Sequence, residues 1–283
     1  MKRNLLLIFG LLPFFLFAQF QRDFVQAEIQ FKNGENLKGW IYDDFAQSDK
    51  QSKADEKGSG YVTAVTTGTI VQTRYANFPT VLKKITYKVN YEDGQQQQFE
   101  DETIDFIITT KNSETYKYKT LKFIRPAFEK DGITLKMDTV NRDIWAPVLK
   151  EGKLNMYGYF TYSNYKRASW SEVYFQKEND DFAYQIFLPY KFHSKENHSK
   201  LIQTSIQNAF GDCSYFNNNI ETITETFLND LKTAFSPFSK QEGQEIKSYP
   251  KDQRQMIEYI ILERRSYVPY SNIYDLYMQH CGQ

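Results

Sequence analysis

The chain has 283 residues, with 35 basic and 35 acidic side chains, and 17% of its residues are aromatic. A net charge of zero excludes the broad electrostatic attraction used by nucleic-acid-binding proteins and by polybasic proteins that bind anionic membranes. The length allows one large domain or two small ones. The abundance of tyrosine and phenylalanine favours β structure.

The first 18 residues have the build of a secretory signal peptide. Lys2 and Arg3 place positive charge at the start, and Leu5 to Ala18 is an uncharged apolar run. That run is shorter than the roughly 20 residues that span a bilayer, and it ends on a small residue, as cleavage sites do. We therefore predict cleavage after Ala18, export to the periplasm or cell surface, and no transmembrane segment in the mature chain.

Alternation of apolar and polar residues predicts an antiparallel β-rich domain over residues 19–195. Val25 to Phe31 and Leu37 to Tyr42 flank Asn33-Gly34, which is the signature of a β-hairpin. A long polar stretch at 46–60 is typical of a loop or insertion. The further expected strands and turns are Tyr61–Arg74, Ile85–Tyr91 with Asp93-Gly94, Gln95–Phe99, Ile104–Thr110, Thr115–Phe123, Val148–Leu149 with Leu154–Tyr162, Val173–Gln176 and Phe182–Leu188.

After about residue 197 the apolar period changes to that of a helix, which predicts a helical region over residues 196–283 that packs on or follows the β domain. Because strands precede helices instead of alternating with them, the expected fold class is α+β. The inward faces expected for three helices are Leu201, Ile202, Ser205, Ile206, Ala209 and Phe210; then Ile220, Ile223, Phe227, Leu228 and Leu231; then Met256, Ile257, Ile260 and Ile261, with a short fourth helix at Ser271–His280.

The chain has two cysteines, Cys213 and Cys281, and three histidines. In an oxidising compartment the cysteines would form one disulfide, and two unpaired thiols are the alternative, because sequence alone does not give their separation. His193 and His198 are five residues apart, which is not the spacing of two metal ligands on one helix face. No catalytic residue, metal site or cofactor is therefore assigned.

Carboxylates supply the one catalytic alternative. Three acids, Asp101, Glu102 and Asp105, cluster at the start of an apolar strand. They have two interpretations: an acid–base pair of a secreted, glycosidase-like hydrolase, or a turn whose carboxylates are solvated. The acidic segment 178–181 lacks the spacing of a calcium loop and is expected to be a hairpin turn. Since no nucleophile motif accompanies these acids, a non-catalytic binding or structural protein is the leading hypothesis.

The strongest binding candidate is a tyrosine-rich stretch comprising Tyr157, Tyr159, Tyr162 and Tyr165. Neighbouring positions on a strand point to opposite faces, so one face is expected to be core and the other to expose tyrosine rings. An exposed ring platform would suit a glycan or another envelope protein, whereas nucleic acid is excluded by the charge. The alternative is that the tyrosine rings pack at the margin of the hydrophobic core and only their hydroxyl groups reach the solvent.

The order of several short motifs resembles a group of uncharacterised secreted proteins of Bacteroidota bacteria. The matching pieces are Phe17-Ala18-Gln19, Lys32-Asn33-Gly34 with Gly39-Trp40-Ile41, Tyr91-Glu92-Asp93-Gly94, Asp101-Glu102-Thr103-Ile104-Asp105-Phe106, Gly152-Lys153-Leu154-Asn155-Met156-Tyr157 and Phe210-Gly211-Asp212-Cys213. The resemblance covers roughly residues 1–235. It implies a location in the cell envelope and this kind of fold, and it carries over no functional residue.

Overall fold

The computed structural model describes residues 24–42, 84–90, 96–111, 114–129, 131, 134–163, 168–186 and 195–282. The expected signal peptide, the polar stretch at 46–60, the strand at Tyr61–Arg74 and the Asp93-Gly94 turn lie outside these residues.

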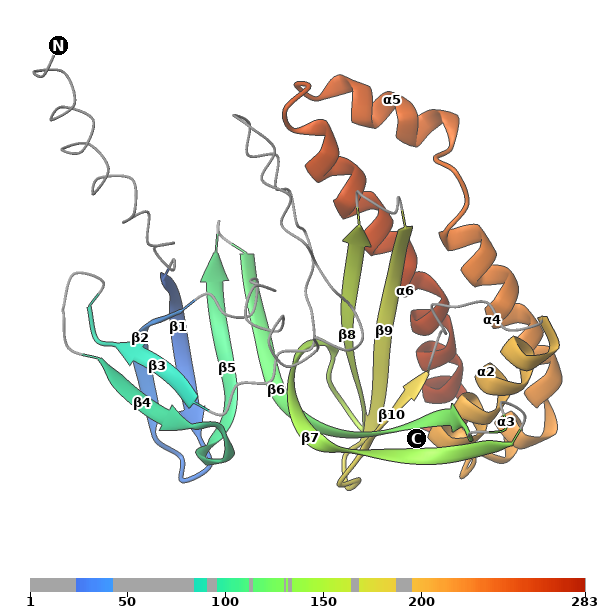
Figure 1. Ribbon diagram of the computed structural model, residues 1–283, viewed down its shortest axis with the longest axis horizontal. Coiled ribbons are helices and arrows are strands. Elements are labelled where there is room, and N and C mark those ends of the chain that lie inside the picture. Colours follow the sequence, from blue (N-terminus) through green and yellow to red (C-terminus); the bar gives the residue numbers. More distant parts are fainter. Residues whose placement is uncertain are drawn as a thin grey trace, which may run out of the picture.

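The described chain forms strands first and helices afterwards, which confirms the α+β class (Figure 1). The strands are β1 Phe24–Phe31, β2 Asn36–Tyr42, β3 Lys84–Lys88, β4 Gln97–Glu100, β5 Ile104–Lys111, β6 Glu114–Phe128, β7 Leu135–Lys150, β8 Leu154–Ser163, β9 Ala168–Lys177 and β10 Ala183–Ile186. The helices are α2 Lys195–Phe210, α3 Ser214–Asn218, α4 Ile220–Ala234, α5 Lys240–Ser248 and α6 Arg254–His280. All ten strands belong to one sheet, in the order β10-β9-β8-β7-β6-β5-β1-β2-β3-β4.

The first hairpin follows its turn signal. Gly34 has a φ of 91°, which favours glycine because it has no Cβ, and the amide of Glu35 donates to Asn33 Oδ1 at 3.0 Å. The strands pair antiparallel, with Ile29 opposite Leu37. The core of this N-terminal half gathers the alternate side chains Val25, Ala27, Ile29, Phe31, Ile41, Ile85, Tyr87, Ile104, Ile107, Tyr118 and Trp145.

The other half of the sheet closes into a five-stranded barrel. β10 pairs antiparallel with β9 and also parallel with β6, where Ala183 lies opposite Phe123. Strands β6 to β10 therefore form a ring, and the long strand β6, which also pairs with β5, connects it to the N-terminal half (Figure 1). The interior is filled by Leu121, Phe123, Ile144, Ala146, Tyr157, Tyr159, Tyr174 and Ala183.

The helices pack against the outside of this barrel. α2 contacts β6 and β10, and α6 contacts β8 and β9. The predicted face of the first helix is confirmed, since Leu201, Ile202, Ser205, Ile206, Ala209 and Phe210 are all buried. The second is confirmed at Ile223, Phe227 and Leu231. Within the described parts of the chain, no helix is both long and apolar enough to cross a membrane.

The prediction for the last helices was wrong in two respects. The segment from Arg254 to His280 is one helix that continues through Pro269, instead of two separate helices. Of the four residues predicted to face inward, Ile261 is buried, Ile257 and Ile260 are half-buried and Met256 is exposed, whereas Tyr259 and Tyr270 are buried. The segment from Met256 to Ile261 is apolar at every position except Glu258, so its pattern did not fix which side of the helix faces the sheet.

Candidate functional site

Tyr157 and Tyr159 point into the barrel and are each only 2% exposed, so neither belongs to an accessible platform. The opposite face of β8 is also buried, because Leu154, Met156 and Phe160 lie beneath the helices. Phe160, for example, meets the ring of Tyr259 at 5.1 Å. Because the barrel closes, both faces of β8 are buried, whereas the sequence predicted that one face would be exposed to solvent. The side chain of Tyr162, and Tyr165 altogether, lie outside the described residues.

A polar cluster lies inside the barrel beside these tyrosines. Tyr174, which is fully buried, donates to Glu172 Oε2 at 2.9 Å, and Gln185 Nε2 lies 3.4 Å from the same oxygen. Burial first, and then the charge of Glu172, raises the pKa of Tyr174 well above its ordinary value. Tyr174 therefore stays a neutral hydrogen-bond donor that holds the carboxylate in place.

A second tyrosine in the barrel also donates its hydroxyl to a polar side chain of β9. Tyr157 donates to Gln176 Oε1 at 3.2 Å, and Gln176 Nε2 donates to the carbonyl of Asp180 at 2.8 Å. Along β9, polar residues at every second position, Glu172, Tyr174 and Gln176, alternate with Val173 and Phe175. This period of two is the sequence pattern that could have predicted that the three polar side chains lie on the same face of the strand. These contacts stabilise the barrel, because buried polar groups that pair with one another avoid the cost of desolvation.

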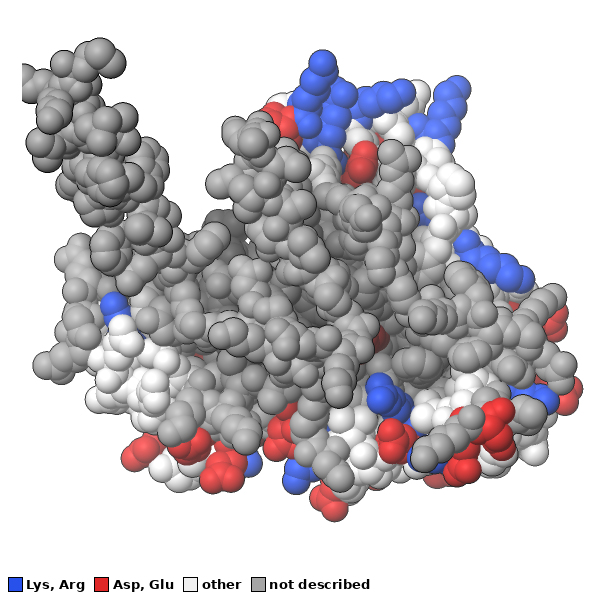
Figure 2. All heavy atoms as spheres, in the orientation of Figure 1, with Lys and Arg blue, Asp and Glu red and all other residues white. Residues whose placement is uncertain are grey.

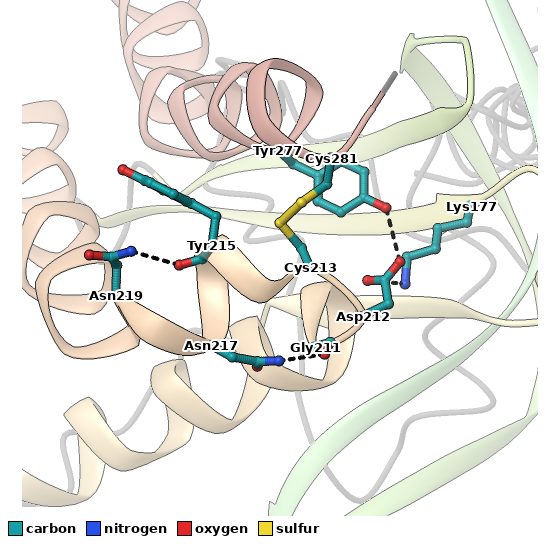
Figure 3. The surroundings of a disulfide bond; sticks show 9 residues. All are labelled: Lys177, Gly211, Asp212, Cys213, Tyr215, Asn217, Asn219, Tyr277 and Cys281. Atoms are coloured by element: carbon teal, nitrogen blue, oxygen red, sulfur yellow. Dashed lines mark hydrogen bonds and ion pairs between the residues drawn. A yellow bond between two sulfur atoms is a disulfide. The ribbon is translucent and has the colours of Figure 1, made fainter.

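The two cysteines form a disulfide that joins the turn before α3 to the end of α6 (Figure 3). Their Cα atoms are 5.8 Å apart, within the normal range for such a bond. Cys213 is buried in the same core as Phe210, Phe216 and Tyr277. Of the two arrangements that the sequence left open, the structure has the paired one.

Hydrogen bonds and stacking surround this disulfide (Figure 3). Tyr277 donates to Asp212 Oδ2 at 3.2 Å, and Lys177 Nζ lies 2.7 Å from Asp212 Oδ1. Burial, followed by the charge of Asp212, raises the pKa of Tyr277 to about 12. His280 stacks on Tyr215 with ring centroids 3.7 Å apart. The network ties α6 to the β9–β10 hairpin and to α3.

The remaining candidates do not converge on one site. Glu102 lies in the short 3-10 turn Asp101–Thr103, and both it and Asp105 are exposed. His193 and the side chains of Asp101 and His198 lie outside the described residues. The acidic segment 178–181 forms the β9–β10 turn, in which the amide of Asp180 donates to the carbonyl of Lys177. Among the residues that the structure describes, no group of three His, Cys, Asp or Glu could hold a metal ion.

Comparison with known proteins found no matching family model, no matching curated protein and no matching solved structure.

Proposed function

We propose that this chain is an exported protein of the cell envelope that acts by binding or as a structural component. The observation that supports export most directly is the disulfide between Cys213 and Cys281. Such bonds persist in oxidising compartments and are rare where thiols are kept reduced. The charged start and apolar run of residues 1–18 support the same conclusion independently.

The packing of the barrel supports a non-catalytic role. Its interior is occupied by aromatic and aliphatic side chains, and the carboxylate of Glu172 is held there by Tyr174. A glycosidase needs two carboxyl groups that face one substrate. Of the three acids that the sequence singled out for that task, Glu102 lies exposed in a turn and Asp105 lies exposed at the start of β5, while the side chain of Asp101 is outside the described residues.

N-terminal sequencing of protein isolated from the native envelope tests export. We expect the mature chain to begin at Gln19, with no free thiol under denaturing conditions. A chain that begins at Met1, or one that carries two reactive thiols in its native compartment, would contradict the proposal.

A panel of chromogenic glycosides and peptides tests the non-catalytic part. We expect no turnover by the purified protein. Turnover that disappears in Asp101→Asn or Glu102→Gln, while both variants keep the wild-type melting temperature, would establish the carboxylate hydrolase instead.

A further inference from the structure

One edge of the described sheet is open. Because β10 pairs with both β9 and β6, each of the ten described strands except β4 lies between two neighbouring strands. β4, Gln97–Glu100, pairs with β3 on one side and ends the sheet at the side remote from the helices (Figure 1). The outer side of an edge strand presents backbone N–H and C=O groups without ladder partners, which form a template for a strand of another chain.

The sequence of β4 lacks the residues that usually protect such an edge. Lysine and proline prevent edge-to-edge pairing, and β4 contains neither. Gln97 and Gln98 are exposed, and their amide groups make no side-chain hydrogen bond in the part of the chain that the structure describes. The described atoms visible at this end of the sheet are mostly uncharged, with acidic side chains along the lower rim (Figure 2). A strand that approaches β4 therefore meets little charge.

The two faces of β4 differ in polarity. Phe99 packs against the core of the N-terminal half, where its ring centroid lies 4.9 Å from that of Phe31 and 5.9 Å from that of Tyr87. It is only half-buried, at the strand that ends the described sheet. Gln98 and Glu100 point to the opposite face. A partner strand that fits this edge has an apolar side chain beside Phe99 and polar side chains on the other face.

We propose that the open edge pairs with β4 of a second copy of the chain, antiparallel across a twofold axis. With Phe99 opposite its own counterpart, the two rings meet on the core face, where aromatic cross-strand pairs are stabilising. The same register places Gln98 opposite Glu100 of the partner subunit, so that an amide donor faces a carboxylate. It also keeps the two Glu100 carboxylates apart. β4 is therefore complementary to itself, and the inference goes beyond the proposed function because it names a partner.

Sedimentation equilibrium of the purified chain tests this inference. A pair of four-residue strands buries much less than the roughly 1,200 Å² of a stable interface, so we expect a monomer–dimer equilibrium with a Kd between about 1 μM and 1 mM. Gln97→Lys with Gln98→Lys places like charges along the edge and should raise that Kd at least about tenfold.

An exchange of side chains tests the register. Gln98→Glu places a carboxylate opposite Glu100 of the partner subunit and should raise the Kd several-fold, because like charges directly opposite are destabilising. Adding Glu100→Gln restores one amide opposite one carboxylate, so the double variant should recover the Kd of the wild type. This pair of variants also decides the matter if the lysine variant fails to fold.

The matched control is Gln26→Lys with Thr139→Lys, which adds the same charge at exposed positions on β1 and β7. It should dimerise nearly as well as the wild type, and thermal melts should show each variant folded. A wild type that is monomeric at every concentration, a dimer unaffected by the edge lysines, or equal weakening in the control would overturn the inference. None of these outcomes bears on export, which N-terminal sequencing tests separately.

Discussion

The two halves of the sheet hide their aromatic side chains in different ways. In the barrel, Tyr157 and Tyr174 are enclosed because β10 pairs with β6 and closes the ring of strands. In the N-terminal half, Phe24 and Phe106 stay half-buried on the outer face. Lys88 Nζ and Lys117 Nζ lie over these two rings, each 4.4 Å from the centroid. Alternation of apolar and polar residues therefore does not by itself predict which face of a strand is exposed to solvent. Closure of the barrel buries one face of its strands, and lysine side chains cover aromatic rings on the outer face of the N-terminal half.

Alkaline pH should have the largest effect, because it should destabilise the barrel and the helices more than the N-terminal half of the sheet. Burial raises the pKa of Tyr157, Tyr174, Tyr259, Tyr267 and Tyr270 above the ordinary value of 10.0, and that of Tyr277 to about 12. These tyrosines lie in the barrel and in α6. A raised folded-state pKa gives stability that is complete below pH 10 and lost as the pH rises, for Tyr277 between 10 and about 12. Hydrogen exchange at increasing pH should show the barrel and helices opening, and opening of β1 and β2 first would contradict this expectation.

Loss of the disulfide should have the next largest effect. The bond joins residues 68 apart in sequence, and a loop of that size corresponds to about 4 kcal/mol of stabilisation. Urea unfolding of Cys213→Ser with Cys281→Ser should show a loss of that order, matched by the wild type after reduction. The control is the variant with reductant added, which should change no further. Equal stability with and without the bond would mean that the network of Asp212, Tyr277 and Lys177 holds α6 without it.

Removal of a shielding lysine should have a small effect. Lys88→Ala should cost about 0.5–1 kcal/mol, because Phe24 loses both the cation and the covering side chain. Lys88→Met keeps most of the covering side chain and should cost less. Lys136→Met, at an exposed position on β7, is the control and should be neutral. If Lys88→Ala and Lys136→Met unfold at the same urea concentration, lysine shielding does not stabilise the N-terminal half.

Local patterns in the sequence predicted the elements that depend on neighbouring residues. The hairpin around Asn33-Gly34 needs only its turn and two alternating strands, and it was found with nearly correct ends. The helix Lys195–Phe210 has a clear apolar face and was found as well. Of the strand Leu135–Lys150, only Val148–Leu149 was predicted, because Asp138, Arg142 and Asp143 interrupt the apolar alternation of the preceding residues.

Long-range pairing was not predictable from those patterns. Nothing in the four residues of β10 indicates that they pair with Phe123 and Ile124 on β6. Without that contact, the expectation of an exposed tyrosine face on β8 was reasonable, and with it Tyr157 and Tyr159 become core. The disulfide belongs to the same class, since its two partners are distant in sequence and only the fold brings them together.

The pairing of β10 with β6 also bears on how the chain reaches its native state. During synthesis, β6 to β9 emerge before β10, so β9 and the second half of β6 first present unpaired edges. Contacts between residues distant in sequence form slowly, and exposed strand edges are templates for association between chains. The short strand Ala183–Ile186 therefore covers these two edges when it pairs with both β9 and β6.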